Sequence, residues 1–280
     1  MNAHLTVVET GPLTTIQDFG RPGLASLGIG RSGAADRGAH RLANALVGNH
    51  PTLATLEVTL GGLVLEADSD LVLALTGARC PGAPYAAPFA LRRGDQLRLG
   101  MPQAGLRSYL AVRGGIVVEP VLGSRATDTL SGIGPPVIRD GTRLPVGEPD
   151  RSPPGVDVAP VPEPPAGSVD IPILPGPRRD RFGTGAWEAL VSGTFTVDDR
   201  SDRIGVRLAG EPLPRGRQGE LVSEGVLRGA LQVPPDGLPV LFLADHPVTG
   251  GYPVIAYVED DAVDRCAQVR PGQQLRFTEA

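Results

Sequence analysis

Glycine and proline interrupt this chain more often than long helices allow. The sequence contains 38 glycines and 29 prolines in 280 residues. Glycine weakens a helix interior and proline breaks it, whereas both are common in the turns between short strands. Hydrophobic residues make up 41% of the chain and charged residues 20%, so the chain can still bury a core. We therefore expect a mainly β fold of two barrel-like domains in tandem, with few and short helices.

Short runs of β-branched and apolar residues mark the expected strands. Two of them, Thr55–Leu60 and Leu63–Ala67, flank Gly61-Gly62, and a two-residue glycine turn of this kind predicts a β-hairpin. The other expected strands are Leu71–Leu75, Gln96–Leu99, Ser108–Val112, Thr194–Val197, Val226–Val233, Pro239–Ala244, Val254–Val258 and Gln274–Phe277.

Three short helices are expected among these strands. The clearest one runs from Asp36 to Val47, where apolar residues recur at helical spacing between an aspartate cap and a glycine. Arg37, Arg41 and Asn44 form the opposite, polar face of this helix. The other two helices span about Gly185–Val191 and Asp261–Val269.

A proline-rich segment divides the chain. Residues 148–170 read EPDRSPPGVDVAPVPEPPAGSVD, which predicts an extended, semi-rigid connector. We therefore expect an N-terminal β domain with one amphipathic helix over residues 1–147 and a C-terminal β-barrel domain over residues 171–280. Residues 94–99 and 272–277 share a glycine, a glutamine, a leucine and an arginine at matching positions. This echo supports the expectation of two related domains.

Charge and residue usage exclude several classes of function. The net charge of −5 argues against nucleic-acid binding. All 26 basic residues are arginine, which excludes a Walker A lysine, a Schiff base and biotin carried on this chain. Any anion that the chain binds must be held by arginine or by backbone N–H groups. Cys80 and Cys266 lie far apart and no histidine pair has ligand spacing, so we expect no structural metal site. The second cysteine is expected in the core.

The sequence also indicates a location. No apolar run approaches the roughly 20 residues of a membrane span, and the first residues lack the basic and apolar regions of a signal peptide. With two cysteines and no disulfide framework, we expect a cytoplasmic protein.

Three stretches combine glycine, proline and functional polar side chains, namely residues 11–37, 201–208 and 223–252. The segments that lie in or overlap these stretches are GPLTTIQDFGRPG, SGAADRGAHRLANALVGN, SDRIGVRLAG, SEGVLRGALQVPPDGLPVLFLAD and TGGYPVIAYV, and LEVTLGG lies at residues 56–62. With these segments the chain resembles the biotin-dependent carboxyltransferase-like family, whose members include the C subunit of 5-oxoprolinase, allophanate hydrolase subunit 2 and a bacterial kinase-inhibitor antagonist. The resemblance covers nearly the whole chain except the proline-rich segment. One departure is the sequence DHPVT at residues 245–249, where the family often has a glutamine.

The resemblance implies a fold and a function. It implies that the C-terminal domain is cyclophilin-like and that the chain is the C subunit of an ATP-dependent 5-oxoprolinase, a hydrolase that opens the lactam ring of 5-oxoproline to glutamate. The implied partners are the A subunit of that enzyme and its B subunit, which is a kinase-inhibitor-like protein, and the chain is inactive alone. The implied cofactor is ATP with Mg²⁺. The alternatives are a carboxyltransferase component related to urea carboxylase, with biotin delivered on another chain, and a non-catalytic antagonist that binds a kinase-inhibitor partner.

Lactam opening with ATP requires cations against the developing phosphoryl charge and a carboxylate for proton transfer or Mg²⁺. Arg203 is the candidate catalytic residue that binds a phosphate or a substrate carboxylate. Glu224 and Asp245 are the candidate catalytic carboxylates. The backbone amides of Gly250 and Gly251 are expected to form an anion nest. The candidate substrate- or nucleotide-binding residues are Asp18, Arg21, Ser32, Arg37, Gln232, Thr249, Gly250, Gly251 and Tyr252.

Overall fold

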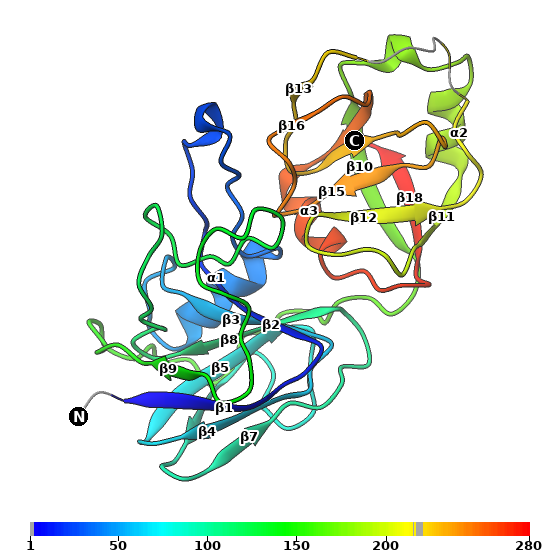
Figure 1. Cartoon of the computed structure of the whole chain (residues 1–280). Helices are drawn as coiled ribbons and strands as arrows, with labels where there is room; N and C mark the ends of the chain where they lie inside the picture. Colours follow the sequence, from blue (N-terminus) through cyan, green and yellow to red (C-terminus); the bar gives the residue numbers. More distant parts are fainter. Residues whose placement is uncertain (1–2, 215, 217–220) are drawn as a thin grey trace. The chain divides into compact units, whose positions relative to one another are not determined.

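Short strands account for most of the regular structure of this chain. The computed structural model describes residues 3–214, 216 and 221–280. Each α-helix among these residues has ten residues or fewer (Figure 1). The expected mainly β fold is therefore confirmed. The chain forms two units: unit 1 comprises Met1–Arg21 and Ser32–Pro164, and unit 2 comprises Pro22–Arg31 and Pro165–Ala280.

Unit 1 contains two antiparallel sheets. Its strands are β1 (His4–Thr10), β2 (Leu13–Gln17), β3 (Thr55–Thr59), β4 (Leu63–Ala67), β5 (Leu71–Gly77), β6 (Pro88–Leu91), β7 (Gln96–Arg98), β8 (Arg107–Val112) and β9 (Arg143–Pro145). One sheet has the order β7-β4-β1-β9 and the other the order β2-β3-β8-β5-β6. Both sheets contribute to a single cluster of buried apolar side chains. It includes Leu5 and Leu65 from the first sheet and Leu56 and Leu73 from the second. The core of unit 1 is therefore built from inward-facing residues of both sheets.

Helix α1 (Arg37–Leu46) covers the other face of the five-stranded sheet, and this predicted helix is confirmed. Asp36 caps its first turn by accepting a hydrogen bond from the Ala39 amide at 2.8 Å. Side chains alternate along β8, so that Leu110 enters the inter-sheet core while Tyr109 and Ala111 pack with the helix.

Asn44 corrects the predicted polar face of α1. It is fully buried. Its side-chain amide donates to the Leu53 carbonyl at 2.8 Å, and its oxygen accepts from the Asn49 side chain at 2.9 Å. Because these partners come from the segment after the helix, helical spacing alone does not separate this buried amide from an exposed one.

The β-hairpin expected at Gly61-Gly62 is wrong. β3 pairs with β2 and β8, whereas β4 pairs with β1 and β7, so the two strands lie in different sheets. Leu60, Gly61 and Gly62 all have positive φ, and the chain passes here from one sheet to the other. A Cβ on Gly11, in the connection between β1 and β2, would lie 2.1 Å from the Gly61 carbonyl oxygen. The glycines therefore allow two connections to cross closely.

Unit 2 is built around a closed barrel of seven strands. In barrel order these are β10 (Val169–Pro175), β17 (Val254–Val258), β14 (Ala230–Gln232), β15 (Val240–Phe242), β12 (Gly205–Ala209), β11 (Thr194–Val197) and β18 (Gln274–Glu279). The first and last strands, β10 and β18, pair in parallel and close the barrel. Closure removes the free sheet edges, and the expected C-terminal barrel is confirmed.

Two short helices pack on the barrel core. They are α2 (Ala186–Ser192) and α3 (Asp260–Cys266). Trp187 and Leu190 of α2 and Val263 and Cys266 of α3 belong to the same buried cluster as the barrel strands. Cys266 is 0% exposed, so this cysteine is a core residue, as expected, and burial raises the pKa of its thiol to about 12.

The proline-rich segment contributes to both units. The Tyr85 hydroxyl donates to the Pro162 carbonyl at 3.2 Å in unit 1. The Gln273 side chain donates to the Pro165 carbonyl at 3.0 Å in unit 2. The change from one unit to the other therefore falls between Pro164 and Pro165, inside the segment.

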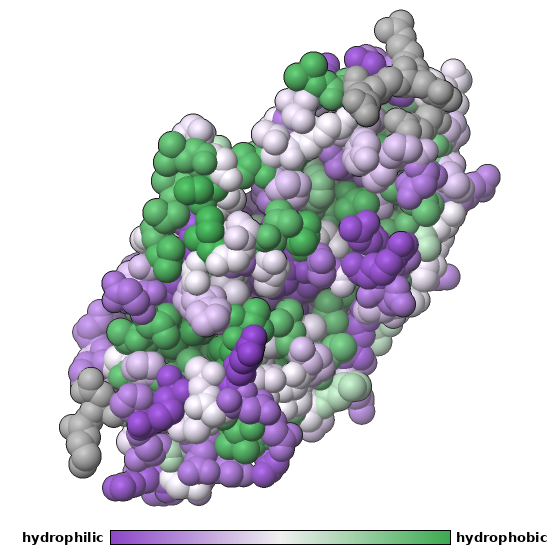
Figure 2. All heavy atoms as spheres, in the orientation of Figure 1, coloured by the Kyte–Doolittle hydropathy of each residue, from purple (hydrophilic) through white to green (hydrophobic). Residues whose placement is uncertain are grey.

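Apolar and charged residues are interspersed on the face of the molecule that Figure 2 shows. Exposed apolar side chains such as Leu27 and Met101 are ordinary on a protein surface. Within residues 3–214, 216 and 221–280, no helix has the length and apolar character to cross a bilayer.

Candidate functional site

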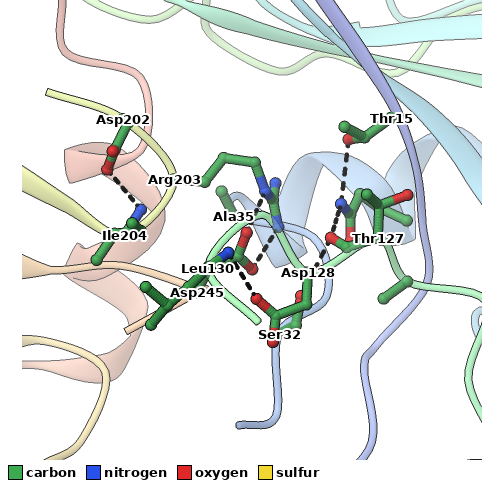
Figure 3. Close-up of polar contacts among 12 residues, drawn as sticks. Thr15, Ser32, Ala35, Thr127, Asp128, Leu130, Asp202, Arg203, Ile204 and Asp245 are labelled. Carbon is green, nitrogen blue, oxygen red and sulfur yellow. Dashed lines mark hydrogen bonds and ion pairs between the residues drawn. The ribbon is translucent and has the colours of Figure 1, made fainter. Parts of the chain in front are cut away.

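Arg203 and Asp245 form a buried ion pair at the ends of two barrel strands. Arg203 precedes β12 and Asp245 follows β15, and the Asp245 amide donates to the Arg203 carbonyl at 3.0 Å. Their side chains meet through two hydrogen bonds, Nε to Oδ2 at 2.9 Å and Nη2 to Oδ1 at 3.1 Å (Figure 3). Their side chains are 1% and 0% exposed. The ladder of β12 and β15 thus brings together two predicted site residues that are 42 positions apart.

This pairing constrains the chemistry that either residue can perform. The two guanidinium donors that face Asp245 are occupied, and the carboxylate is neutralised by the arginine. Neighbouring Asp202 fixes the turn before β12, because its Oδ1 accepts from the Ile204 amide at 2.7 Å and the Gly205 amide at 3.1 Å. The pair therefore links the turn before β12 to the turn after β15. Anion binding by Arg203 stays a prediction.

Glu224 also has an arginine partner. Its carboxylate accepts from Arg178 Nε at 2.9 Å and from Arg178 Nη2. This hydrogen bonding lowers the pKa of Glu224, so the carboxylate is ionised at neutral pH and unsuited to donate a proton. Sequence analysis missed Arg178, although it lies in the arginine-rich run after Gly176-Pro177.

A two-stranded ribbon holds the predicted residues around Gly250. β13 (Glu224–Gly225) pairs with β16 (Thr249–Gly250), so that Gly250 lies in a β ladder. The anion nest expected from the Gly250 and Gly251 amides stays a prediction. A Cβ on Gly250 would lie 2.5 Å from the Gln232 side-chain nitrogen. That nitrogen donates to the Tyr252 carbonyl at 3.0 Å. Glycine is needed here because the buried Gln232 amide approaches the ribbon closely.

These residues do not fit a magnesium site. Mg²⁺ is held by carboxylate and other oxygen ligands, but Glu224 and Asp245 are each bound to an arginine. Among the residues that the structure describes, no three His, Cys, Asp or Glu side chains gather in a group that could hold a metal ion.

In unit 1, Asp18 follows β2, and its carboxylate accepts hydrogen bonds from uncharged donors. Oδ1 accepts from the Gly20 amide at 2.7 Å and the Ser124 hydroxyl at 2.6 Å. Oδ2 accepts from the Arg125 amide at 2.6 Å. Asp18 is 7% exposed. Its carboxylate therefore braces the loop after β2 against the segment at residues 124–125.

Arg21 and Ser32 contact the continuation of the same segment. Arg21 Nη2 donates to the Ala126 carbonyl at 2.5 Å, and the Ser32 hydroxyl donates to the Thr127 carbonyl at 3.3 Å. Ser32 has a φ of 54°, which is uncommon for a residue with a side chain. Arg37, the fourth predicted residue of this unit, is the half-buried first residue of α1. Three of the four predicted residues thus meet at residues 124–127.

Sequence analysis missed the segment that gathers them. The Thr127 amide donates to the Ile16 carbonyl at 2.9 Å, which places the segment beside β2. The next residue, Asp128, accepts from the Leu130 and Ser131 amides at 2.9 and 3.0 Å (Figure 3). The signal that could have found it was the polar run Ser-Arg-Ala-Thr-Asp at residues 124–128, which lies between glycines like the stretches that were singled out.

A buried network fixes the loop that carries Ser32. Glu57 Oε2 accepts from the Ala35 amide at 3.0 Å and from the Tyr109 hydroxyl at 2.8 Å. The same hydroxyl accepts from the Asp36 amide at 2.7 Å. Burial raises the pKa of Tyr109 well above its ordinary value of 10, so the hydroxyl stays protonated. The loop from Ser32 to Asp36 is therefore held by two strand residues whose role a strand pattern does not reveal.

Comparisons with known proteins agree with this architecture. Residues 27–279 match the family model "Carboxyltransferase domain, subdomain A and B". The chain is 38% identical to the 5-oxoprolinase C subunit of Escherichia coli (strain K12), over 98% of this chain and 91% of that protein. It is 32% identical to the urea amidolyase of Saccharomyces cerevisiae, over 98% of this chain and 16% of that protein.

Solved structures give the same result. The structure of TTHA0988 superposes with a TM-score of 0.89 at 38% identity and covers 99% of this chain. The Kluyveromyces lactis urea amidolyase superposes with a TM-score of 0.91 at 28% identity, over 99% of this chain and 19% of that one. This chain spans 56% of TTHA0988, so that protein contains regions that have no counterpart here.

The family resemblance drawn from the sequence motifs is confirmed by these matches. The family model covers most of the chain, and the similarity to a curated relative extends over nearly the full length of both proteins. This chain belongs to the carboxyltransferase-domain family, subdomains A and B.

Proposed function

We propose that this chain is the C subunit of a 5-oxoprolinase. The observation that supports this most is the 38% identity to the C subunit of Escherichia coli, which extends over 91% of that protein. The C subunit of Haemophilus influenzae is 32% identical over 90% of its length. The urea amidolyases match over 16% of their length, so most of those proteins has no counterpart in this chain.

The proposed reaction opens a five-membered lactam. An amide carbonyl is a poor electrophile, and transfer of a phosphoryl group from ATP to its oxygen makes that oxygen a leaving group. ADP is released, water adds to the activated carbon, and the ring C–N bond breaks with the amine as the leaving group. A second water hydrolyses the resulting acyl phosphate to glutamate and inorganic phosphate. Such a reaction needs a positioned lactam, a bound ATP with Mg²⁺, and groups that stabilise the transferred charge.

We assign Mg²⁺ and ATP to the other two components of the enzyme. The candidate carboxylates of this chain, Glu224 and Asp245, are neutralised by Arg178 and Arg203, and neither is placed to bind a divalent cation. The chain has no lysine, and Arg178 and Arg203 already bond to these carboxylates. In this proposal the chain binds and orients the lactam, and the A and B subunits complete the enzyme, which is inactive without them.

A second candidate is a carboxyltransferase component. It is supported by the name of the family model and by the urea amidolyase relatives. Biotin would then arrive on another chain, because this chain has no lysine to carry it. A third candidate, a module that binds a kinase-inhibitor partner without turnover, predicts partner binding and no activity in any mixture.

The three candidates are separated by reconstitution. This chain alone, the A and B subunits together, and the mixture of all three are assayed for phosphate release from ATP with 5-oxoproline or urea. We expect release that requires 5-oxoproline and the complete mixture. Full activity of the A and B subunits without this chain would contradict the proposal. Transfer of carboxylate from carboxybiotin to urea would support the second candidate, and tight binding to the B subunit without turnover would support the third.

A further inference from the structure

Gln17 and Thr127 are buried polar residues of unit 1. Gln17 is 0% exposed and Thr127 is 3% exposed. Within the part of the chain that the structure describes, Gln17 Oε1 and Thr127 Oγ1 have no partner. Leaving a buried polar group unpaired is costly, and such a group in a native fold calls for an explanation, which is often a functional one.

The orientation of the Gln17 amide is fixed by its other end. Gln17 Nε2 donates to the Thr127 carbonyl at 2.9 Å and to Thr15 Oγ1 at 3.1 Å. Exchanging the amide oxygen and nitrogen would set the Gln17 oxygen against the Thr127 carbonyl, which cannot donate. The amide oxygen is therefore the free acceptor of Gln17. Because Gln17 Nε2 bonds to the Thr127 carbonyl, Thr127 and the Gln17 amide are adjacent in the structure.

The loop beside these atoms is held in an uncommon conformation. Ser32 has a φ of 54° and donates to the same Thr127 carbonyl at 3.3 Å, which is a long hydrogen bond. A Cβ on Gly33 would lie 2.7 Å from the Gly20 amide nitrogen, so the loop lies tightly against the residues after β2. Strained residues of this kind cluster at functional sites.

The free atoms define a ligand chemistry. The Gln17 oxygen needs an N–H donor, and the Thr127 hydroxyl can donate to a carbonyl oxygen. A lactam offers an N–H and a C=O side by side on one edge, and urea offers the same pair. We propose that Gln17 and Thr127 recognise the cis-amide edge of the substrate, beside the loop that carries Ser32. This inference rests on the proposed function, and it extends that function by naming the residues that bind the N–H and C=O groups of the lactam.

Thr127→Val and Thr127→Ser test the inference as a matched pair. Valine keeps the shape of threonine and removes only the unpaired hydroxyl, so the melting temperature of the chain is expected to stay the same or rise. In the reconstituted enzyme, we expect Thr127→Val to raise the KM for 5-oxoproline by about ten-fold or more. Serine keeps the hydroxyl and removes a buried methyl, so Thr127→Ser is expected to lower the melting temperature and leave KM within a few-fold of the wild type.

The outcomes separate this inference from the proposed function. An active wild-type mixture with an unchanged KM for Thr127→Val would overturn the inference and leave the proposed function standing. A lower melting temperature for Thr127→Val, with KM unchanged, would overturn it as well and show that the hydroxyl binds a structural water.

A direct binding measurement covers the case of an inactive wild-type mixture, which would contradict the proposed function. Calorimetric titration of the complex with 5-oxoproline and, separately, with urea identifies the source of the amide edge. Tighter binding of either compound to the wild type than to Thr127→Val would support the inference. Equal binding to both forms would overturn it.

Discussion

Asp18, directly after β2, and Asp245, in the turn after β15, are both buried carboxylates, and they are stabilised in opposite ways. Asp18, in unit 1, accepts hydrogen bonds from two backbone amides and a serine hydroxyl. Asp245, in unit 2, is paired with the guanidinium of Arg203. The local sequence does not distinguish the two environments, because the Ser124, Arg125 and Arg203 donors come from distant positions. The effect of a buried carboxylate on the stability of the fold therefore depends on whether its hydrogen-bond donors are neutral or charged.

The difference has a consequence for mutational tolerance. When another side chain replaces Asp18, the backbone amides that donate to it remain in place. Each of these amides then loses one hydrogen bond. Loss of Asp245 breaks the buried ion pair with Arg203, and breaking such a pair costs more than the pair itself contributes. The largest effects on stability are therefore expected in unit 2.

Asp245→Ala should have the largest effect. We expect the free energy of unfolding to fall by about 3–5 kcal/mol, because Arg203 loses its buried partner. Denaturant unfolding of the purified chain measures the loss. Replacing both partners, as Arg203→Met with Asp245→Leu, should recover most of it. A double variant that is as unstable as Asp245→Ala would show that the cost does not come from breaking the buried ion pair.

His40 extends the comparison to a buried base that has uncharged partners. Its ring nitrogens lie 2.9 Å from Thr55 Oγ1 and 3.0 Å from the Pro51 carbonyl oxygen. Desolvation by burial lowers the pKa of His40 from 6.5 to about 4. The folded state therefore binds a proton less readily than the unfolded state, and stability is lost as the pH falls from 6.5 to 4.

Over that range the loss should reach about 3 kcal/mol, at 1.36 kcal/mol for each pH unit between the two pKa values. The measurement is the free energy of unfolding at pH values from 7 to 4. His40→Gln is the control, since glutamine has no charge to gain, and its stability should vary less with pH. An equally steep decline in His40→Gln would assign the pH dependence to other groups.

Asp18→Asn should have a smaller effect than Asp245→Ala. Asparagine keeps one acceptor oxygen but sets an amide nitrogen against the Arg125 amide or the Ser124 hydroxyl. We expect a loss of about 1–3 kcal/mol in the free energy of unfolding, from one unsatisfied buried donor. Denaturant unfolding beside Asp245→Ala gives the ranking, and a reversed ranking would contradict the comparison.

Glu224→Gln should have the smallest effect on stability. Glu224 and Arg178 also form an ion pair, but more than a third of each side chain is exposed to water, where such pairs contribute little. The melting temperature of this variant should match that of the wild type within error. A fall comparable with that of Asp245→Ala would mean that exposure is not what separates the two pairs.

The strands and helices that the sequence predicted are those with local signals. The helix from Asp36 rests on a cap and a periodic stripe, and Leu63–Ala67, Thr194–Val197 and Val254–Val258 are strands at the expected residues. β10 was missed because two prolines lie within its Val169–Pro175 span. The prediction of a hairpin at Gly61-Gly62 was wrong because glycine indicates a turn but does not indicate which strands pair with each other.

The candidate site was predictable residue by residue but not as an arrangement. Asp18, Arg203, Glu224 and Asp245 stood out as polar residues in loops at strand ends. Except for the Gly20 amide, which donates to Asp18 from two residues away, the partners described for these residues are 42 to 107 positions away, and no local pattern links them. The contribution of Thr127 was hidden for the same reason, since an unpaired hydroxyl is visible only when its surroundings are known.

The most direct test of the account is glutamate formation from 5-oxoproline by the A and B subunits, with and without this chain. The account predicts glutamate and phosphate in equal amounts, formed only when the chain is present and reduced at low substrate by Thr127→Val. Equal glutamate formation without this chain, or none in the complete mixture, would contradict it.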